Sequence, residues 1–118
     1  MIAHIVLFNP KTSVTQAQRV AFGQLIANVF GAVPAVSRVR VGKRIDVDPG
    51  YSRYLGDSAY EFSAVAEFED KDSLVEYLNH PLHHELGRMF WETCESTVVI
   101  EVSCVDGKDA EAVLALVR

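Results

Sequence analysis

Residues 2–8 read IAHIVLF, and this stretch decides the fold. Apolar and β-branched residues occupy both alternating sets of positions, which predicts a strand covered on both faces rather than one with a face in water. Residues 97–102 read TVVIEV and carry a similar two-sided pattern. We therefore expect the first and the last strand of the chain to need apolar cover on both sides of a sheet.

Helical spacing follows the first strand. Apolar residues recur at intervals of three and four over 15–30, which predicts an amphipathic helix. Ser13 and Gln16 have the spacing of a capping box at its start, and Gly31 stands where a left-handed C-cap is favoured.

Two further strands are expected over 36–45 and 60–68, because apolar residues alternate with other residues there. The connection 46–58 contains Pro-Gly and Gly-Asp turn markers and is longer than most connections in a small domain. A lid or partner contact and a simple hairpin tip both remain open for it.

The second helical region is divided by a proline. Asp70 is expected to cap a short helix ending at residue 78, and the pair His80-Pro81 to start another helix. The interpretation of His80 is that of a helix-boundary residue whose ring is a local hydrogen-bond partner. A last short helix is expected over 109–117.

The order strand, helix, strand, strand, helix pair, strand predicts an α+β fold of the ferredoxin-like kind. It consists of a four-stranded antiparallel sheet with helices on one face. We assign residues 1–108 to this domain and 109–118 to a C-terminal extension. Helices cover only one face of the sheet, so the other face needs an apolar partner. A second copy of the chain is the simplest partner, because it requires no other protein. The sequence therefore predicts a homodimer that encloses a barrel between two sheets.

Charge and composition exclude several classes of function. Eleven Lys and Arg residues against sixteen Asp and Glu residues give a net charge of −5, which argues against nucleic acid or an anionic membrane as a partner. No apolar run approaches the roughly 20 residues that span a bilayer. Cys94 and Cys104 lack CxxC spacing, and the N-terminus lacks the zones of a signal peptide. We expect a reduced, cytoplasmic protein.

Three segments resemble the stress-responsive α/β-barrel (Dabb) family: MIAHIVLF at 1–8, VPAVSRVRVG at 33–42 and EYLNHPLH at 76–83. The HPxH element at the end of the third segment is the most specific part. The resemblance extends over residues 1–105 and implies ferredoxin-like homodimers whose two sheets form a barrel. Most bacterial members have no assigned activity, whereas the plant branch includes a polyketide cyclase.

Polar side chains on otherwise apolar faces mark a candidate site. His4 shares its strand face with apolar residues, and His83 and Tyr77 lie on the apolar sides of their helices. If the helices pack on the face of His4, the three side chains can line one pocket between sheet and helices. The other residues expected to line it are Val6, Phe8, Phe22, Ile26, Leu86 and Phe90.

These residue types suit proton transfer. A histidine can take and return a proton near neutral pH, and a tyrosine hydroxyl can donate to a developing oxyanion. Resemblance to the plant cyclase implies that Tyr77 and His83 are catalytic and that His4 lines the pocket. Gly23, Ile26 and Cys94 depart from that enzyme's pocket residues, so its substrate does not carry over.

Two hypotheses remain. One is a homodimer that binds a small apolar or carbonyl-containing ligand, or only assembles, with the three polar residues satisfied in a packed core. The other is a cofactor-independent cyclase, lyase or isomerase with His83 as base and Tyr77 as hydrogen-bond donor. No cofactor is expected, and no metal, because His80, His83 and His84 do not converge as ligands.

Overall fold

The computed structural model describes residues 1–47, 51 and 59–118. Most of the connection 46–58, including its turn markers, lies outside these described residues. The elements are β1 (Ile2–Pro10), α1 (Gln16–Ala32), β2 (Arg38–Lys43), β3 (Phe62–Phe68), α2 (Lys71–Asn79), α3 (Pro81–Thr93), β4 (Cys94–Ser103) and α4 (Ala110–Val117). The strands form an antiparallel sheet in the order β2-β3-β1-β4, which confirms the ferredoxin-like α+β prediction.

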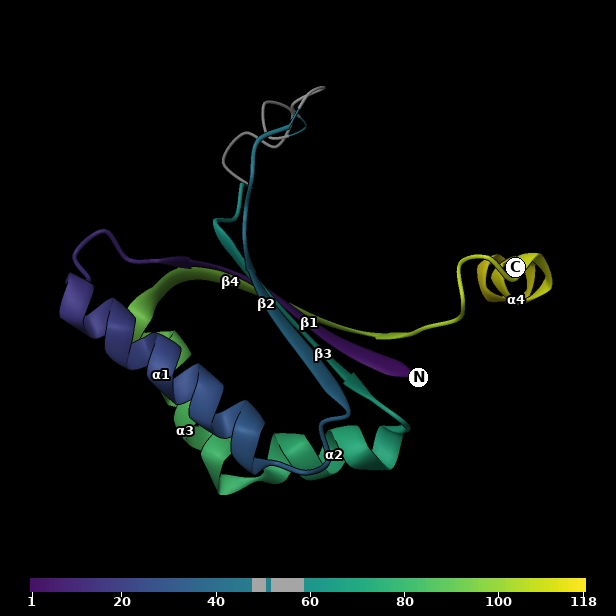
Figure 1. The fold of residues 1–118 in the computed structure, drawn as a ribbon, viewed down its shortest axis with the longest axis horizontal. Coiled ribbons are helices and arrows are strands. Elements are labelled where there is room, and N and C mark those ends of the chain that lie inside the picture. The colour runs from purple at the N-terminus through teal and green to yellow at the C-terminus, as the bar shows by residue number, and fades with distance from the viewer. Residues whose placement is uncertain (48–50, 52–58) are drawn as a thin grey trace.

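The first strand lies inside the sheet, between β3 and β4. Ile5 of β1 stands opposite Val65 of β3 on one side and Ile100 of β4 on the other. Helices α1, α2 and α3 all lie against one face of this sheet (Figure 1). Because side chains alternate along a strand, His4 belongs to the helix-covered face and Ile5 to the open face.

The ends of α1 differ from the expected ones. Its capping box is formed by Thr15 and Gln18, with the Gln18 side chain 2.8 Å from the Thr15 N–H, and not by Ser13 and Gln16. The reason is geometric, because the backbone is extended at Thr15, whereas Ser13 lies in the turn before it.

The C-terminal end of α1 also needs a correction. The helix runs past Gly31 to Ala32 and closes at Val33, whose N–H donates to the Val29 carbonyl. Val33 takes an extended conformation and is buried in the core. No left-handed residue is needed, because the chain leaves the helix toward β2 in extended form and Pro34 prevents further turns.

The two-helix region follows its predicted caps. Asp70 accepts a hydrogen bond from the Ser73 N–H at 2.8 Å, and this bond is the main reason that its pKa is lowered. His80 caps α3, with its Nδ1 accepting from the Leu82 N–H at 3.1 Å, and Pro81 occupies the first turn. The prediction of His80 as a helix-boundary residue is confirmed, and His84 is exposed on the outer side of α3.

β4 begins at Cys94, three residues before the expected start. A register shift opposite Asn9 and Pro10 lets the strand pair with β1 from its first residue. Cys94 therefore belongs to the sheet rather than to the end of the preceding helix.

An aromatic cluster fills one end of the layer between sheet and helices. Phe90 makes edge-to-face contacts with Phe8 and Phe22, with ring centroids 4.9 and 4.8 Å apart. Phe8 lies four residues along β1 from His4, and Phe8 and Phe22 are both buried in this cluster.

The other face of the sheet carries no helix in the described parts of the chain (Figure 1). Its side chains are mostly apolar, and Val98 and Ile100 are 41 % and 48 % exposed. The register places Ile5, Leu7, Val65, Val98, Ile100 and Val102 on this face. We call these six residues the open face. Among the described helices, none is both long and apolar enough to cross a bilayer.

Candidate functional site

A cavity of about 460 Å³ lies between the sheet and the helices, and its lining extends from His4 and Glu101 to Phe90 and Cys94. Its deep wall consists of buried residues from β1, β3 and α1, among them Val6, Ala66 and Ile26. Its exposed lining residues come from α3 and β4, where Trp91 is 86 % and Val99 is 52 % exposed. The cavity therefore opens between α3 and the edge strand β4.

His4 reaches the cavity from β1 and is 6 % exposed. Its Nδ1 lies 3.0 Å from Oε1 of Glu101, which stands directly opposite on β4. A carboxylate can only accept, so Nδ1 carries the proton of this hydrogen bond. Glu101 thus fixes both the orientation and the tautomer of His4.

His83 reaches the cavity from the first turn of α3. Its Nδ1 lies 3.1 Å from the carbonyl oxygen of Leu78, so Nδ1 donates and Nε2 of the neutral ring is an acceptor. Burial lowers the pKa of His83, and the nearby charge of His4 lowers it further. The ring is therefore neutral at neutral pH, which is the state that a proton acceptor needs.

Tyr77 comes from the last turn of α2 and is 1 % exposed. Its ring packs against Phe30 and Phe68. Within the described residues its hydroxyl has no hydrogen-bond partner, yet no buried side-chain oxygen or nitrogen there is sealed off without one. The hydroxyl must therefore face the open space of the cavity. Burial raises the pKa of Tyr77 to about 12, so the group stays protonated and can donate.

The three side chains meet although they belong to three different elements. The ring centroids of Tyr77 and His83 are 4.7 Å apart, and those of His4 lie 5.9 Å from Tyr77 and 6.3 Å from His83. One phenol and two imidazoles that converge in one cavity can donate hydrogen bonds to a carbonyl or hydroxyl group and can accept or return a proton.

The remaining residues expected at the pocket divide into two groups. Val6, Ile26, Leu86 and Phe90 line the cavity. Phe8 and Phe22 lie behind Phe90 in the aromatic cluster and are not part of the cavity wall.

Sequence reasoning missed the residues of the cavity mouth. Trp91, Glu95 and Glu101 all line the opening. Glu101 could have been noticed as a lone acid in an apolar strand, although its partner His4 is 97 residues away in the chain.

Two other chemistries find little support at this site. Cys94 lines the cavity, but burial raises its pKa to about 11, so it is a thiol and not a thiolate nucleophile. Across the described part of the chain, no group of three or more His, Cys, Asp or Glu side chains is arranged to hold a metal ion.

Comparisons with known proteins agree with this architecture. The chain is 26 % identical over 94 residues to olivetolic acid cyclase from Cannabis sativa, covering 77 % of this chain and 87 % of the cyclase. Its fold is similar to the hydroxynitrile lyase from Passiflora edulis (TM-score 0.74, 18 % identity, 89 % and 94 % of the two chains). It is also similar to a dimeric ferredoxin-like protein of unknown function from Thermobifida fusca (TM-score 0.69, 21 % identity, 87 % and 90 %). Residues 2–104 match the stress responsive A/B barrel domain, and the chain thus belongs to the Dabb family.

Proposed function

We propose that this protein is a homodimer that binds a small, mainly apolar, uncharged molecule with a carbonyl or hydroxyl group in the cavity beside His4, Tyr77 and His83. The observation that carries the proposal is the Tyr77 hydroxyl, which is held on a buried ring without a protein partner among the described residues. A hydroxyl donor without a protein partner inside an apolar cavity is available to form a hydrogen bond with a ligand.

The lining supports an uncharged ligand. Burial keeps His83 neutral and Tyr77 protonated near pH 7, and the described lining includes no Lys or Arg. Glu95 and Glu101 add acidic groups at the mouth. A carboxylate ligand would meet these acids without a fixed cation to compensate them, whereas a ketone, aldehyde or phenol meets only hydrogen-bonding groups.

A second candidate function, acid–base catalysis, is favoured by the tautomers that Leu78 and Glu101 impose. Nε2 of His83 accepts a proton from the carbon next to a carbonyl, while the Tyr77 hydroxyl donates to the carbonyl oxygen as charge develops there. The resulting enolate is protonated again by the His83 imidazolium, which restores the enzyme. The names of two relatives, a cyclase and a lyase, are consistent with an enzyme on this scaffold.

The homodimer is supported by the open face. Val98 and Ile100 are exposed, and the register places them beside the half-buried Leu7 and Ile5, so apolar side chains lie next to one another on β1 and β4. Apolar surfaces of this kind in monomers are often interfaces. A relative of the same fold is described as dimeric. A second sheet packed on this face gives both faces of β1 the cover that its sequence requires.

Binding is tested by titrating the full chain with three probes of similar size, namely acetophenone, phenol and benzoate. We expect amide NMR shifts at His4, Tyr77 and His83 with the two neutral probes and at least about tenfold weaker binding of benzoate. Two results would overturn the proposal. One is benzoate binding with the same affinity as the neutral probes. The other is shifts confined to a second groove between α1 and β2, which is lined by Gly23, Ala27 and Val39 among others.

Catalysis is tested separately by the exchange of the methyl protons of acetophenone in D2O. The protein should accelerate exchange, and His83→Gln should remove about 10²-fold or more of that acceleration. Binding without any acceleration would refute the acid–base candidate and leave the binding function standing.

A further inference from the structure

Helix α4 is apolar on nearly every side. Glu111 is its one charged residue before Arg118, and Leu114, Leu116 and Val117 are 54 %, 53 % and 73 % exposed. A helix that is apolar all round is normally buried, and a helix of eight residues is marginal in water without packing. The helix therefore needs a surface to cover it.

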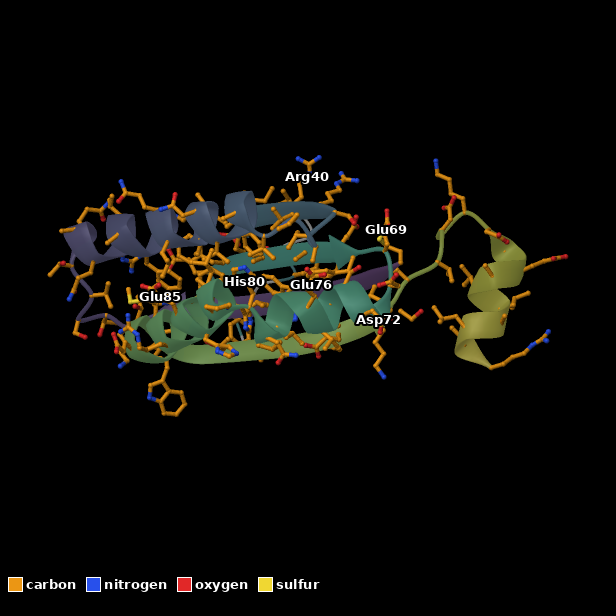
Figure 2. All side chains as sticks on the ribbon, turned by 90° about the horizontal axis from the view of Figure 1, so that it is seen from below. Arg40, Glu69, Asp72, Glu76, His80 and Glu85 are labelled. Carbon is orange, nitrogen blue, oxygen red and sulfur yellow. The ribbon has the colours of Figure 1, made fainter. Side chains whose placement is uncertain are left out.

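That surface is not the helix's own domain. In both views α4 stands clear of the sheet and of α1, α2 and α3 (Figures 1 and 2). The chain is fixed only up to Cys104, whose N–H donates to the Met1 carbonyl at 2.8 Å. The family match also ends at residue 104. We call residues 105–118 the arm, an addition to the family domain that projects from the end of β4.

We propose that the arm packs against the second copy of this chain, so that each subunit of the dimer holds the other with an exchanged helix. The inference rests on the proposed homodimer and goes beyond it by assigning a role to the arm. The partner it requires is a copy of this chain and not another protein.

Continuity with the open face favours this partner. The arm continues directly from β4, whose residues Val98, Ile100 and Val102 belong to the open face. A copy packed on the open face lies at the root of the arm. Val105, just beyond the end of β4, is 39 % exposed and adds an apolar side chain to the connection toward α4.

Charge complementarity points in the same direction. The first part of the arm carries Asp106, Asp109 and Glu111, with Lys108 as its one basic residue. The cross-strand register places Arg38 and Arg40 of β2 on the side of the sheet that faces the partner, and Arg40 projects at the β2 edge (Figure 2). An acidic arm and a basic edge on the same chain complement each other between two copies.

Photocrosslinking tests the proposal directly. A benzophenone side chain is introduced at Leu114 in the full chain, and 14N- and 15N-labelled proteins are mixed before irradiation. We expect crosslinked peptides that join the two labels. The matched control places the same group at Val75, which is exposed on α2, on the helix-covered side of the sheet, and should give no such peptides.

Sedimentation velocity supplies the energetic readout. Leu114→Glu, or removal of residues 107–118, should raise the dimer dissociation constant at least about tenfold, whereas Lys108→Glu should not. A dimer whose dissociation constant is unchanged in both variants overturns the role of the arm and leaves the dimer standing. Crosslinks only within one label overturn it as well, and a full chain that is monomeric overturns both the arm and the dimer.

Discussion

Replacing Tyr77 by phenylalanine separates a hydroxyl that serves a ligand from one that stabilises the core. The ring packs on Phe30 and Phe68, and phenylalanine keeps those contacts. The hydroxyl makes no hydrogen bond within the described residues, so its removal takes away no protein interaction. At pH 7 we expect Tyr77→Phe to change the free energy of unfolding by less than about 0.5 kcal/mol, against about 1 kcal/mol for a hydrogen-bonded hydroxyl.

The same variant should behave differently at high pH. Burial raises the pKa of Tyr77 from 10 to about 12, so between these values the folded protein binds more protons than the unfolded chain. Stability from this group is present below pH 10 and is lost as the pH rises toward 12. At pH 11 the loss is about 1.4 kcal/mol in the wild type and zero in Tyr77→Phe.

Urea unfolding followed by circular dichroism at pH 7 and pH 11 measures both effects. Tyr77→Ala is the control, because it deletes a fully buried ring and should cost about 3–5 kcal/mol at pH 7. At pH 11 the cost relative to wild type should be about 1.4 kcal/mol smaller, because the wild type has itself lost that amount. In parallel, Tyr77→Phe should weaken the binding of acetophenone while its folded spectrum is unchanged. A loss of more than about 1 kcal/mol at pH 7 together with unchanged ligand binding would refute the assignment of this hydroxyl to the cavity.

Three further predictions concern the rest of the molecule. Because burial lowers the pKa of His83 below 6.5, the unfolded chain binds more protons at this residue than the folded protein, so the free energy of unfolding should fall as pH drops from 6.5 toward 5. His83→Gln should reduce this pH dependence, and an identical pH dependence in the variant would contradict the lowered pKa. Ile100→Glu should shift the dimer to monomer in sedimentation velocity, whereas Val75→Glu on the outer side of α2 should not. Gly23→Ala in mid-α1, where an added Cβ meets nothing within 4 Å, should raise the free energy of unfolding by about 0.5–1 kcal/mol in urea melts, and a decrease would be inconsistent with the helix as described.

The fold could be predicted because its deciding signal is local. Two-sided apolarity in 2–8 and 97–102 indicates strands that need cover on both faces of the sheet, and the order of the elements then allows few topologies. The capping of α1 could not be resolved in this way. Ser13 with Gln16 and Thr15 with Gln18 both have capping-box spacing, and only the backbone geometry at Thr15 decides between them.

The sequence could predict which polar side chains of the candidate site point inward, but not which groups form hydrogen bonds with them. His4, Tyr77 and His83 each stand out as polar residues on an apolar face, which periodicity alone reveals. The contact of His4 with Glu101 depends on the register between β1 and β4, a pairing of residues at opposite ends of the chain. The acceptor of His83 is a backbone carbonyl, which no side-chain pattern can indicate.

Strand β4 connects the candidate site to the proposed interface. Its side chains alternate, so Val99 and Glu101 line the mouth of the cavity while Val98 and Ile100 belong to the open face. β4 is an edge strand, paired only with β1 within the described sheet. A partner packed on the open face would restrict the motion of this edge and thereby hold Glu101 against His4. The orientation of His4 inside one subunit would then depend on contacts with the other subunit. This dependence gives a physical reason for a small domain to place its cavity beside the strand that forms the interface.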